Sequence, residues 1–244
     1  MPVLVTYTPD LRGVFHFKQF SIRQDRSSLK VGTDGVVLGA WARVAGASRV
    51  LDIGTGTGLL ALMVAQRNEH ARIDAVEIDD ASAEQAAENV ANGPWADRIR
   101  VHRMDVRRMH AAEPYDLIIC NPPYYSGEMA SPDARAGVAR HSGELSLEDL
   151  LKQVKELLSE HGRFSCVLPS DREQELLRIA KRYGLELQRR CLVKYLEHRP
   201  AKRVLLEIGR DAITPTDELI IVEHEPGRYT LQYRHLLKDF LLKF

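Results

Sequence analysis

The chain has 244 residues, 44% of them hydrophobic, and its 34 basic and 34 acidic side chains give a formal net charge of zero. This length and composition favour one α/β domain with a full core, and the neutral balance excludes a protein that coats nucleic acid by bulk charge. Three scattered cysteines, no leader-like N-terminus and no membrane-length apolar run favour a cytoplasmic protein with no bound metal, no membrane contact and no obligate protein partner.

Apolar runs alternate with amphipathic segments along most of the chain. Strands are expected near 49–53, 72–78, 99–103, 115–120, 162–168, 187–196 and 202–209. Helices are expected near 34–43, 58–67, 81–91, 146–160, 171–183 and 229–244. Strands that alternate with helices predict a mostly parallel sheet with helices on both faces, and the last two strands are close enough in sequence to form a hairpin.

Two extensions flank this α/β core, and the whole chain is expected to be a single domain. Residues 1–30 are expected to form a strand extension, in which Val3 to Arg23 gives two short strands around Pro9-Asp10. Residues 211–244 are expected to form a strand and a helix, with an edge strand near Leu219 to Glu223.

A glycine-rich turn follows the first strand of the core. The sequence Val50-Leu51-Asp52-Ile53-Gly54-Thr55-Gly56-Thr57-Gly58 runs from an apolar strand into an apolar helix. The glycines permit a tight turn and close approach of a ligand to the backbone, and the helix N-terminus favours polar or anionic groups. The spacing is not that of a dinucleotide site, so a pyrophosphate is not the expected guest.

The next two strands end in acidic residues. Glu77 closes the strand expected at 72–78, about twenty positions after the glycines, where a carboxylate can accept both hydroxyls of a ribose. Asp105 follows the third strand, in Met104-Asp105-Val106. Because ligands bind at the carboxyl ends of strands in an open α/β sheet, these acids are expected at the same edge as the glycine turn.

The most specific motif is Asn121-Pro122-Pro123-Tyr124, directly after the strand expected at 115–120. Two prolines end the strand and stiffen the backbone there. The amide oxygen of Asn121 and the carbonyl of Pro122 can accept both hydrogens of a planar NH2 group, while Tyr124 stacks on the ring that carries it. The long loop that follows, 125–143, is expected to close over the target or to contact phosphate.

Basic side chains gather in two parts of the sequence. Residues 1–49 carry seven Lys or Arg and three acids, and residues 181–210 carry nine and three. Such patches are typical of a protein that binds a folded RNA, although solvated surfaces give the same count. If the second patch contacts RNA, Arg189, Arg190 and Lys194 are the candidate residues.

Together these motifs resemble the class I S-adenosylmethionine-dependent methyltransferases, which have a Rossmann-like, seven-stranded, mostly parallel sheet with an antiparallel edge strand. The segment from Phe17 to Phe20 and the segment Lys30-Val31-Gly32-Thr33-Asp34-Gly35 resemble the opening of the bacterial tRNA1(Val) adenine-N6 methyltransferases, which modify the adenine 3′ of the anticodon. Read physically, Thr33 or Asp34 can cap the helix that follows.

The resemblance implies S-adenosylmethionine as cofactor and the anticodon loop of a tRNA as partner. The glycine turn would wrap the methionine part, Glu77 would hold the ribose and Asp105 would contact the adenine amine. The expected cofactor contacts are Lys30, Thr33, Asp34, Asp52, Gly54, Gly56, Gly58, Glu77, Ile78, Asp105, Val106 and Asn121. The expected catalytic residues are Asn121, Pro122 and Tyr124, and the expected substrate contacts are Pro123, Tyr125, Arg140, Arg189, Arg190 and Lys194.

Other readings of the same motifs stay open. A glutamine side chain is also a planar amide, but the glutamine methyltransferases of release factors carry a helical N-terminal domain for which 49 residues leave no comparable room. An adenine-N6 or guanine-N2 methyltransferase of ribosomal RNA fits the same geometry. A DNA adenine methyltransferase normally adds a target-recognition domain. A cofactor-binding scaffold without activity has no use for Asn121 to Tyr124.

Overall fold

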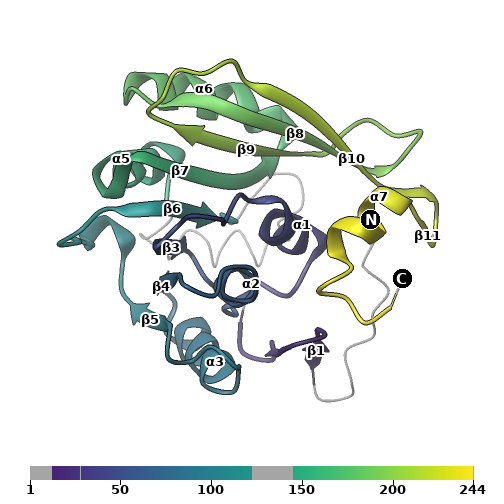
Figure 1. Ribbon diagram of the computed structural model, residues 1–244, viewed down its shortest axis with the longest axis horizontal. Helices are drawn as coiled ribbons and strands as arrows, with labels where there is room; N and C mark the ends of the chain where they lie inside the picture. The colour runs from purple at the N-terminus through teal and green to yellow at the C-terminus, as the bar shows by residue number, and fades with distance from the viewer. Residues whose placement is uncertain (1–12, 28, 123–144, 244) are drawn as a thin grey trace, which may run out of the picture.

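The computed structural model describes residues 13–27, 29–122 and 145–243. Among these residues, the main sheet has nine strands in the order β11-β10-β8-β9-β7-β6-β3-β4-β5 (Figure 1). Its strands are β3 (Arg49–Ile53), β4 (Arg72–Glu77), β5 (Ile99–Arg103), β6 (Tyr115–Cys120), β7 (Leu158–Pro169), β8 (Glu186–Leu196), β9 (Arg203–Gly209), β10 (Thr216–Glu225) and β11 (Arg228–Tyr229). β5, β4, β3, β6 and β7 pair in parallel, and β9 runs antiparallel to both β7 and β8. The mostly parallel sheet and the β8–β9 hairpin are as the sequence predicts.

The sheet is wider than the seven strands predicted. After β9 the chain crosses back to the far side of β8, where β10 pairs with β8 in parallel from Thr216 opposite Arg189 to Glu223 opposite Leu196. β11 then pairs antiparallel with β10 and becomes the edge strand. The antiparallel strand β9 lies inside the sheet because it pairs with β7 on one side and with β8 on the other. The C-terminal extension covers the side of β8 that would otherwise be an edge.

Helices cover both faces of the sheet. The helices are α1 (Thr33–Trp41), α2 (Leu59–Arg67), α3 (Asp80–Ala91), α5 (Leu147–Leu157), α6 (Glu173–Arg182) and α7 (Leu231–Leu237), with short 3-10 turns η1 (Val106–Arg108) and η2 (Ser170–Arg172). Side chains of α1, α2, α3 and α7 form one buried cluster, and those of α5 and α6 form the other. Within β3, Val50 joins the first cluster while Leu51 and Ile53 join the second, as the alternation of side chains along a strand requires.

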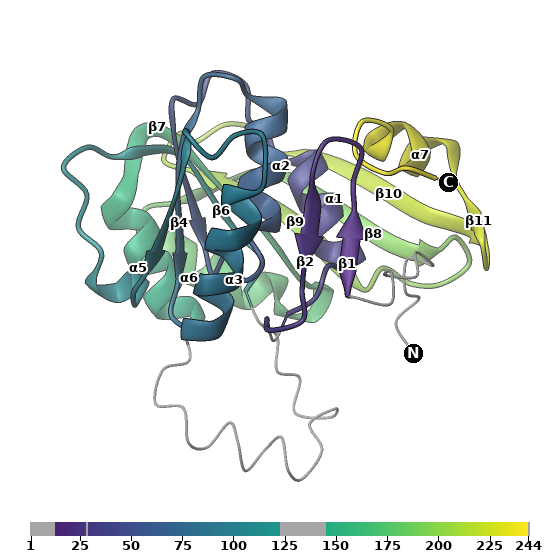
Figure 2. The ribbon, with the colours of Figure 1, turned by 90° about the horizontal axis from the view of Figure 1, so that it is seen from below.

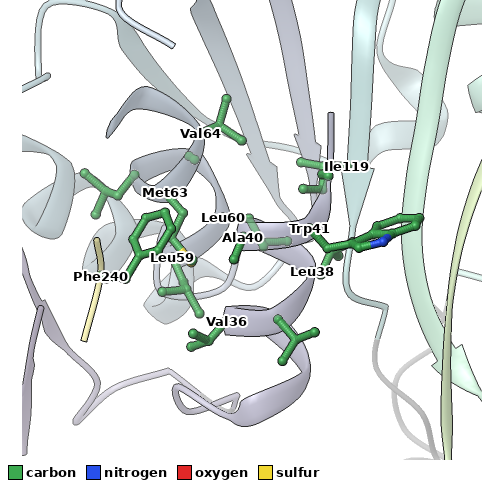
Figure 3. Close-up of a cluster of buried hydrophobic side chains, with 14 of the residues drawn as sticks. Val36, Leu38, Ala40, Trp41, Leu59, Leu60, Met63, Val64, Ile119 and Phe240 are labelled. Atoms are coloured by element: carbon green, nitrogen blue, oxygen red, sulfur yellow. The ribbon is translucent and has the colours of Figure 1, made fainter. Parts of the chain in front are cut away.

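Helix α1 lies in the core rather than on its surface. All but one of its nine residues are buried, and its side chains pack against α2 and the sheet in the cluster of Figure 3. Gly39 permits this contact, because a Cβ there would lie 2.6 Å from the sulfur of Met63. Close packing of α1 fixes its first turn, which faces the carboxyl edge of the sheet.

Residues 13–23 and the segment after α7 meet beside α2 and α3. Strands β1 (Val14–His16) and β2 (Ser21–Arg23) form a two-stranded hairpin against α3, where the Asn89 side chain bonds both backbone groups of Arg23 (Figure 2). The turn between these two strands lies at residues 17–20. The strand predicted before Pro9-Asp10, and Pro9 and Asp10 themselves, lie outside the described residues. The β1–β2 hairpin closes through the amide of Phe17, which donates to the carbonyl of Phe20.

The C-terminal helix is shorter than predicted. Helix α7 ends at Leu237 instead of running to the end of the chain. The chain leaves the helix because Phe240 and Leu241 pack onto the N-terminal hairpin: the amide of Lys18 donates to the carbonyl of Phe240 at 2.8 Å, and Phe17 forms a β-bridge with Leu241. Among the described residues, no helix combines the length and apolar character needed to cross a membrane.

Candidate active site

The glycine turn, Glu77, Asp105 and Asn121, which the sequence predicts to form the site, lie at the carboxyl edge of β3, β4, β5 and β6. β3 lies between β4 and β6, so the chain order reverses beside it, and such a switch point is where open α/β sheets bind ligands. The glycine turn follows β3, Glu77 ends β4, Asp105 follows β5 and Asn121 follows β6. The sheet topology therefore brings four separate sequence motifs to one place.

The glycine turn has a backbone that other residues adopt with strain. Gly54, Gly56 and Gly58 have φ angles of 68°, 58° and 83°. The amides of Gly54 and Thr55 both donate to the carbonyl of Val76 and tie the turn to β4. Gly58 caps α2 without a side-chain hydrogen bond, so the turn presents bare backbone at the start of a helix.

Asp52 is a fully buried carboxyl group below this turn. Its Oδ2 accepts from the hydroxyl of Thr55 at 2.5 Å and from the amide of Ala61 at 3.2 Å, whereas its Oδ1 has no hydrogen-bond partner. Burial is the main cause that raises the pKa of Asp52 to about 7, against the hydrogen bonds that lower it. A buried acceptor without a partner is costly, and it marks a place where a ligand donor fits.

Glu77 organises the end of β4 through its carboxylate. One oxygen accepts from the amide of Gly56, and the other accepts from the amides of Ile78 and Asp79, at 2.9 to 3.0 Å. The oxygen that accepts from Gly56 has a second lone pair direction, so it can accept a further donor such as a hydroxyl group. The other oxygen already accepts two bonds. Beside it, the side chain of Ile78 is 51% exposed, an apolar group left for a planar ring to cover.

Asp105 lies at the end of β5, but its carboxylate has a partner. Both oxygens accept from the guanidinium of Arg107, and one also accepts from the Arg107 amide. The hydrogen bond to Arg107 is the main cause that lowers the pKa of Asp105. Val106 is buried. An adenine amine that uses Asp105 would share it with Arg107.

Asn121 follows β6 and contacts the start of α1. It is half-buried, Pro122 is buried, and a Cβ placed on Gly35 would lie 3.5 Å from the side-chain nitrogen of Asn121. The first turn of α1 thus lies against the Asn121 side chain. Pro123, Tyr124, Tyr125 and Arg140 lie outside the described residues.

The predicted cap of α1 is wrong in detail, because Gly32 is the N-cap residue and no side chain caps it. Asp34 instead accepts from Arg203 Nε at 2.7 Å and from the hydroxyl of Tyr195. Burial and the neighbouring Asp34 carboxylate raise the pKa of Tyr195, which keeps it a donor. Thr33 is buried and Lys30 is exposed at the same edge. The Asp34 carboxylate therefore ties α1 to β8 and β9.

Two arginines predicted to contact RNA are held within the fold. The Arg189 guanidinium lies 4.1 Å from the ring centre of Trp41 and pairs with Glu218 at 2.9 Å and buried Glu207 at 3.5 Å. Its side chain is only 14% exposed. Arg190 pairs with Glu173 at 2.6 Å and Asp217 at 3.4 Å. The sequence prediction counted their charge but not the carboxylates that meet them, which come from other elements.

Lys194 differs from those two arginines, because its one described contact is a 3.5 Å approach to the carbonyl of Glu197. Sequence reasoning also missed Tyr195, Arg203 and Arg107 as neighbours of the site. Arg107 is the one with a local signal, since an arginine two residues after an acid in a tight turn can fold back onto it. Within the described residues, no group of three or more His, Cys, Asp or Glu side chains is arranged to hold a metal ion.

Comparison with known proteins agrees with this geometry. Residues 37–181 match the family model "Methyltransferase small domain". A tRNA1(Val) (adenine(37)-N6)-methyltransferase from Tolumonas auensis is 44% identical over 230 residues, covering 94% of this chain and 97% of the relative. One of the same description from Serratia proteamaculans is 44% identical over 240 residues, covering 97% and 92%. The chain belongs to the tRNA1(Val) (adenine(37)-N6)-methyltransferase family.

Solved structures support the fold of this family member. A crystal structure described as a predicted O-methyltransferase from Agrobacterium tumefaciens has a TM-score of 0.65 and 22% identity, covering 85% of this chain and 96% of its own. TYW2 from Pyrococcus horikoshii in complex with MeSAdo has a TM-score of 0.59 and 16% identity, covering 84% and 74%. The predicted family, class I methyltransferase fold, enzyme class and cofactor S-adenosylmethionine are thereby confirmed.

Proposed function

We propose that this chain transfers the methyl group of S-adenosylmethionine to N6 of adenine 37 in tRNA1(Val), at the site formed by Asn121 and the glycine turn. The observation that carries the proposal is the position of Asn121 at the carboxyl edge of β6, next to the β3 turn, in a chain 44% identical to relatives of that description over nearly its whole length. Action on RNA in the cytoplasm, and the anticodon loop as the part bound, belong to the same proposal.

The described residues fit the cofactor. The strained glycine backbone leaves room for close approach, and a Cβ at Gly54 would meet nothing within 4 Å. The partnerless Oδ1 of Asp52 is suited to a cationic donor, Glu77 to ribose hydroxyls and exposed Ile78 to a ring face. When bound, S-adenosylmethionine supplies an electrophilic methyl group on a positively charged sulfur. The roles of Lys30, Thr33, Asp34, Asp105 and Val106 at this cofactor remain part of the proposal.

Asn121 and Pro122 act on the target amine by positioning it. The adenine amine is a poor nucleophile because its lone pair is delocalised into the ring. The Asn121 amide oxygen and the Pro122 carbonyl each accept one of its two N–H groups. These contacts favour a pyramidal nitrogen whose lone pair is aimed at the methyl group, which lowers the barrier by several kcal/mol. An amide does not take up a proton, so no general base acts at Asn121, and the proton leaves to water after transfer.

The target adenine must leave its stack before it reaches Asn121. That step costs a few kcal/mol, least for a base in a loop, and an aromatic platform returns about 1–3 kcal/mol per base. In the proposal this platform is Tyr124, with Pro123, Tyr125 and Arg140 as further substrate contacts. An anticodon loop is therefore a less costly target than a duplex.

Nucleoside analysis of tRNA tests the proposal directly. tRNA1(Val) from cells that lack the gene should lose N6-methyladenine at position 37, and purified protein with labelled S-adenosylmethionine should restore it. Transfer assays on ribosomal RNA and on release factor run in parallel. Label on ribosomal adenine, on guanine or on a glutamine, with none on tRNA, would be consistent with methyl transfer but would refute tRNA1(Val) as the substrate.

A further inference from the structure

Two buried amide side chains of α3 bind other parts of the chain. Gln85 and Asn89 are four residues apart, so they lie on one side of the helix, and neither is more than 2% exposed. Amides buried this deeply are normally hydrogen-bonded, because an unpaired polar group inside a protein is costly. Their partners are residues 23–27, which come 58 to 66 positions earlier in the chain, and the glycine turn.

Asn89 joins the N-terminal hairpin to the glycine turn. Its side-chain oxygen accepts from the amide of Arg23 at 2.9 Å, and its side-chain nitrogen donates to the carbonyls of Arg23 and Thr57 at 2.8 and 2.9 Å. The next residue of the turn, Gly58, lies against the same helix, since a Cβ there would lie 3.6 Å from the carbonyl oxygen of Ala86. One side chain thus fixes the turn and β2 relative to α3.

Gln85 holds the chain where it passes the glycine turn. Its side-chain oxygen accepts from the amides of Arg26 and Ser27 at 3.0 and 2.8 Å, and its side-chain nitrogen donates to Asp25 at 2.7 Å. Ser27 is buried, and its hydroxyl would lie 3.8 Å from a Cβ on Gly56. The segment that Gln85 holds therefore lies directly against the turn.

The same placement extends to the start of α1. Gln24 is buried, and its side-chain oxygen accepts from the amide of Val31 at 2.8 Å, which ties together the two ends of the connection between β2 and α1. Val31 precedes Gly32, the N-cap of α1, and the first turn of α1 lies against Asn121. The part of the chain positioned by α3 therefore leads from the glycine turn to the Asn121 end of the site.

We infer that Gln85 and Asn89 are positioning residues for S-adenosylmethionine. They hold residues 23–27 against the glycine turn and keep the turn in the shape that binds the cofactor, and neither side chain has to touch the cofactor itself. Glycines adopt more backbone conformations than other residues, so a turn without such contacts loses more entropy when a ligand orders it. The inference concerns the cofactor alone, so it does not depend on which molecule accepts the methyl group.

An exposed ion pair also links this segment to α3, but it contributes less. Arg26 pairs with Glu88, and the two side chains are 36% and 46% exposed. Exposed pairs of this kind stabilise little because water and salt screen them. The variant Glu88→Gln, which removes the pair and leaves both buried amides, should bind S-adenosylmethionine as the wild type does.

Calorimetry of S-adenosylmethionine binding tests the inference. In Asn89→Ala the dissociation constant should rise on the order of tenfold, because the turn loses its contact with α3 and the hairpin loses two bonds. Gln85→Ala should give a smaller rise, since Thr57 keeps its bond to Asn89. An unchanged dissociation constant in Asn89→Ala overturns the inference, as does an equal rise in Glu88→Gln.

Asn68→Ala is the matched control for loss of a buried amide. Asn68 is buried as well, and its side chain bonds four backbone groups at 2.7 to 3.0 Å, the carbonyls of Val44 and Ala47 and the amides of His70 and Ala71. These groups lie before β3 and between α2 and β4, at the edge of the sheet opposite the glycine turn. Asn68→Ala should lower the melting temperature as Asn89→Ala does and keep wild-type cofactor affinity. Equal weakening of cofactor binding in the two variants would assign Asn89 a purely structural role.

Hydrogen exchange in the wild-type protein tests the same coupling without a substitution. Because energetic coupling is reciprocal, bound S-adenosylmethionine should tighten the contacts that favour its binding. Exchange of the backbone amides that donate to Gln85 and Asn89 should slow by a larger factor than exchange of the two amides that donate to Asn68. Equal slowing of both sets would reflect only the general stabilisation that any ligand gives, and it would overturn the inference.

Discussion

The β3–β4 half of the sheet and the β8–β10 half use their charged side chains for different purposes. At β3 and β4, the carboxylates are held by backbone amides and a hydroxyl, and Asp52 keeps one oxygen without a partner. At β8 to β10, Arg189 and Arg190 each meet two carboxylates of the fold. Both halves are rich in ionisable residues, but Arg189 and Arg190 pair with carboxylates of the fold, whereas Asp52 and Glu77 keep oxygen atoms that can accept from a ligand. A charged residue in the sequence therefore indicates a ligand site only when the folded protein does not pair its side chain with an opposite charge.

The largest effect is expected at Asn121, on the ligand-binding half. Asn121→Ala should lower kcat by about 100-fold or more, because the target amine loses an acceptor and its alignment. Asn121→Asp should retain part of the activity, since the carboxylate keeps an acceptor at the same reach. Calorimetry should give wild-type affinity for S-adenosylmethionine in both variants; a matching loss of affinity would mean that Asn121 serves the cofactor instead.

A smaller effect is expected from Gly56→Val. Gly56 has a φ of 58°, which a β-branched residue adopts only with strain, and its amide donates to Glu77. The variant should bind S-adenosylmethionine at least about tenfold more weakly, a change of about 1.4 kcal/mol. Gly46→Val is the matched control for backbone strain, because Gly46 also has a positive φ but precedes β3, whereas the glycine turn follows that strand. Equal affinities in the two variants would contradict the role of the turn.

Proton release should report on Asp52. Its pKa of about 7 lies above the ordinary value of 3.8 because burial disfavours the charged form, so ligand-free protein at about pH 6 carries a mostly protonated Asp52. A cationic group bound beside it lowers the pKa, and up to one proton leaves. At about pH 8 Asp52 is already ionised and releases none.

Calorimetry of cofactor binding in buffers of different ionisation enthalpy measures this release. Asp52→Asn should abolish the difference in proton release between about pH 6 and about pH 8. Release that is the same at both pH values, or that survives in Asp52→Asn, would assign the proton to another group.

The smallest effect is expected for the hydrogen bonds of Asp34, which join helix α1 to β8 and β9. Tyr195→Phe removes one donor to Asp34 and leaves Arg203 in place, so the free energy of unfolding should fall by about 1–2 kcal/mol. Lys194→Met, next to it on β8 and with no described carboxylate partner, should stay within about 0.5 kcal/mol of wild type. Urea denaturation measures the free energy of unfolding of both variants. Equal losses in the two would contradict the structural role of Asp34.

The sequence predicts where the residues of the β3–β4 half lie, for a physical reason. A glycine turn, an acid at a strand end and Asn121-Pro122 each act through backbone geometry next to them in the chain, and parallel topology then brings strand ends together. The partners of Arg189 come from residues 18 and 29 positions away, and the Asp34 partners from more than 160 positions away, so no local pattern shows them. The same limit hid β10 beside β8.

The contrast between the β3–β4 half and the β8–β10 half is tested most directly by the variants Ile78→Ser and Arg189→Met. Cofactor affinity and thermal stability are measured for both. Ile78 is 51% exposed, so serine should leave the melting temperature near wild type and weaken S-adenosylmethionine binding. Arg189→Met leaves buried Glu207 with fewer partners, so it should cost about 3 kcal/mol of stability and keep cofactor affinity. Loss of stability in Ile78→Ser with full affinity, or the reverse in Arg189→Met, would contradict the division between the two halves.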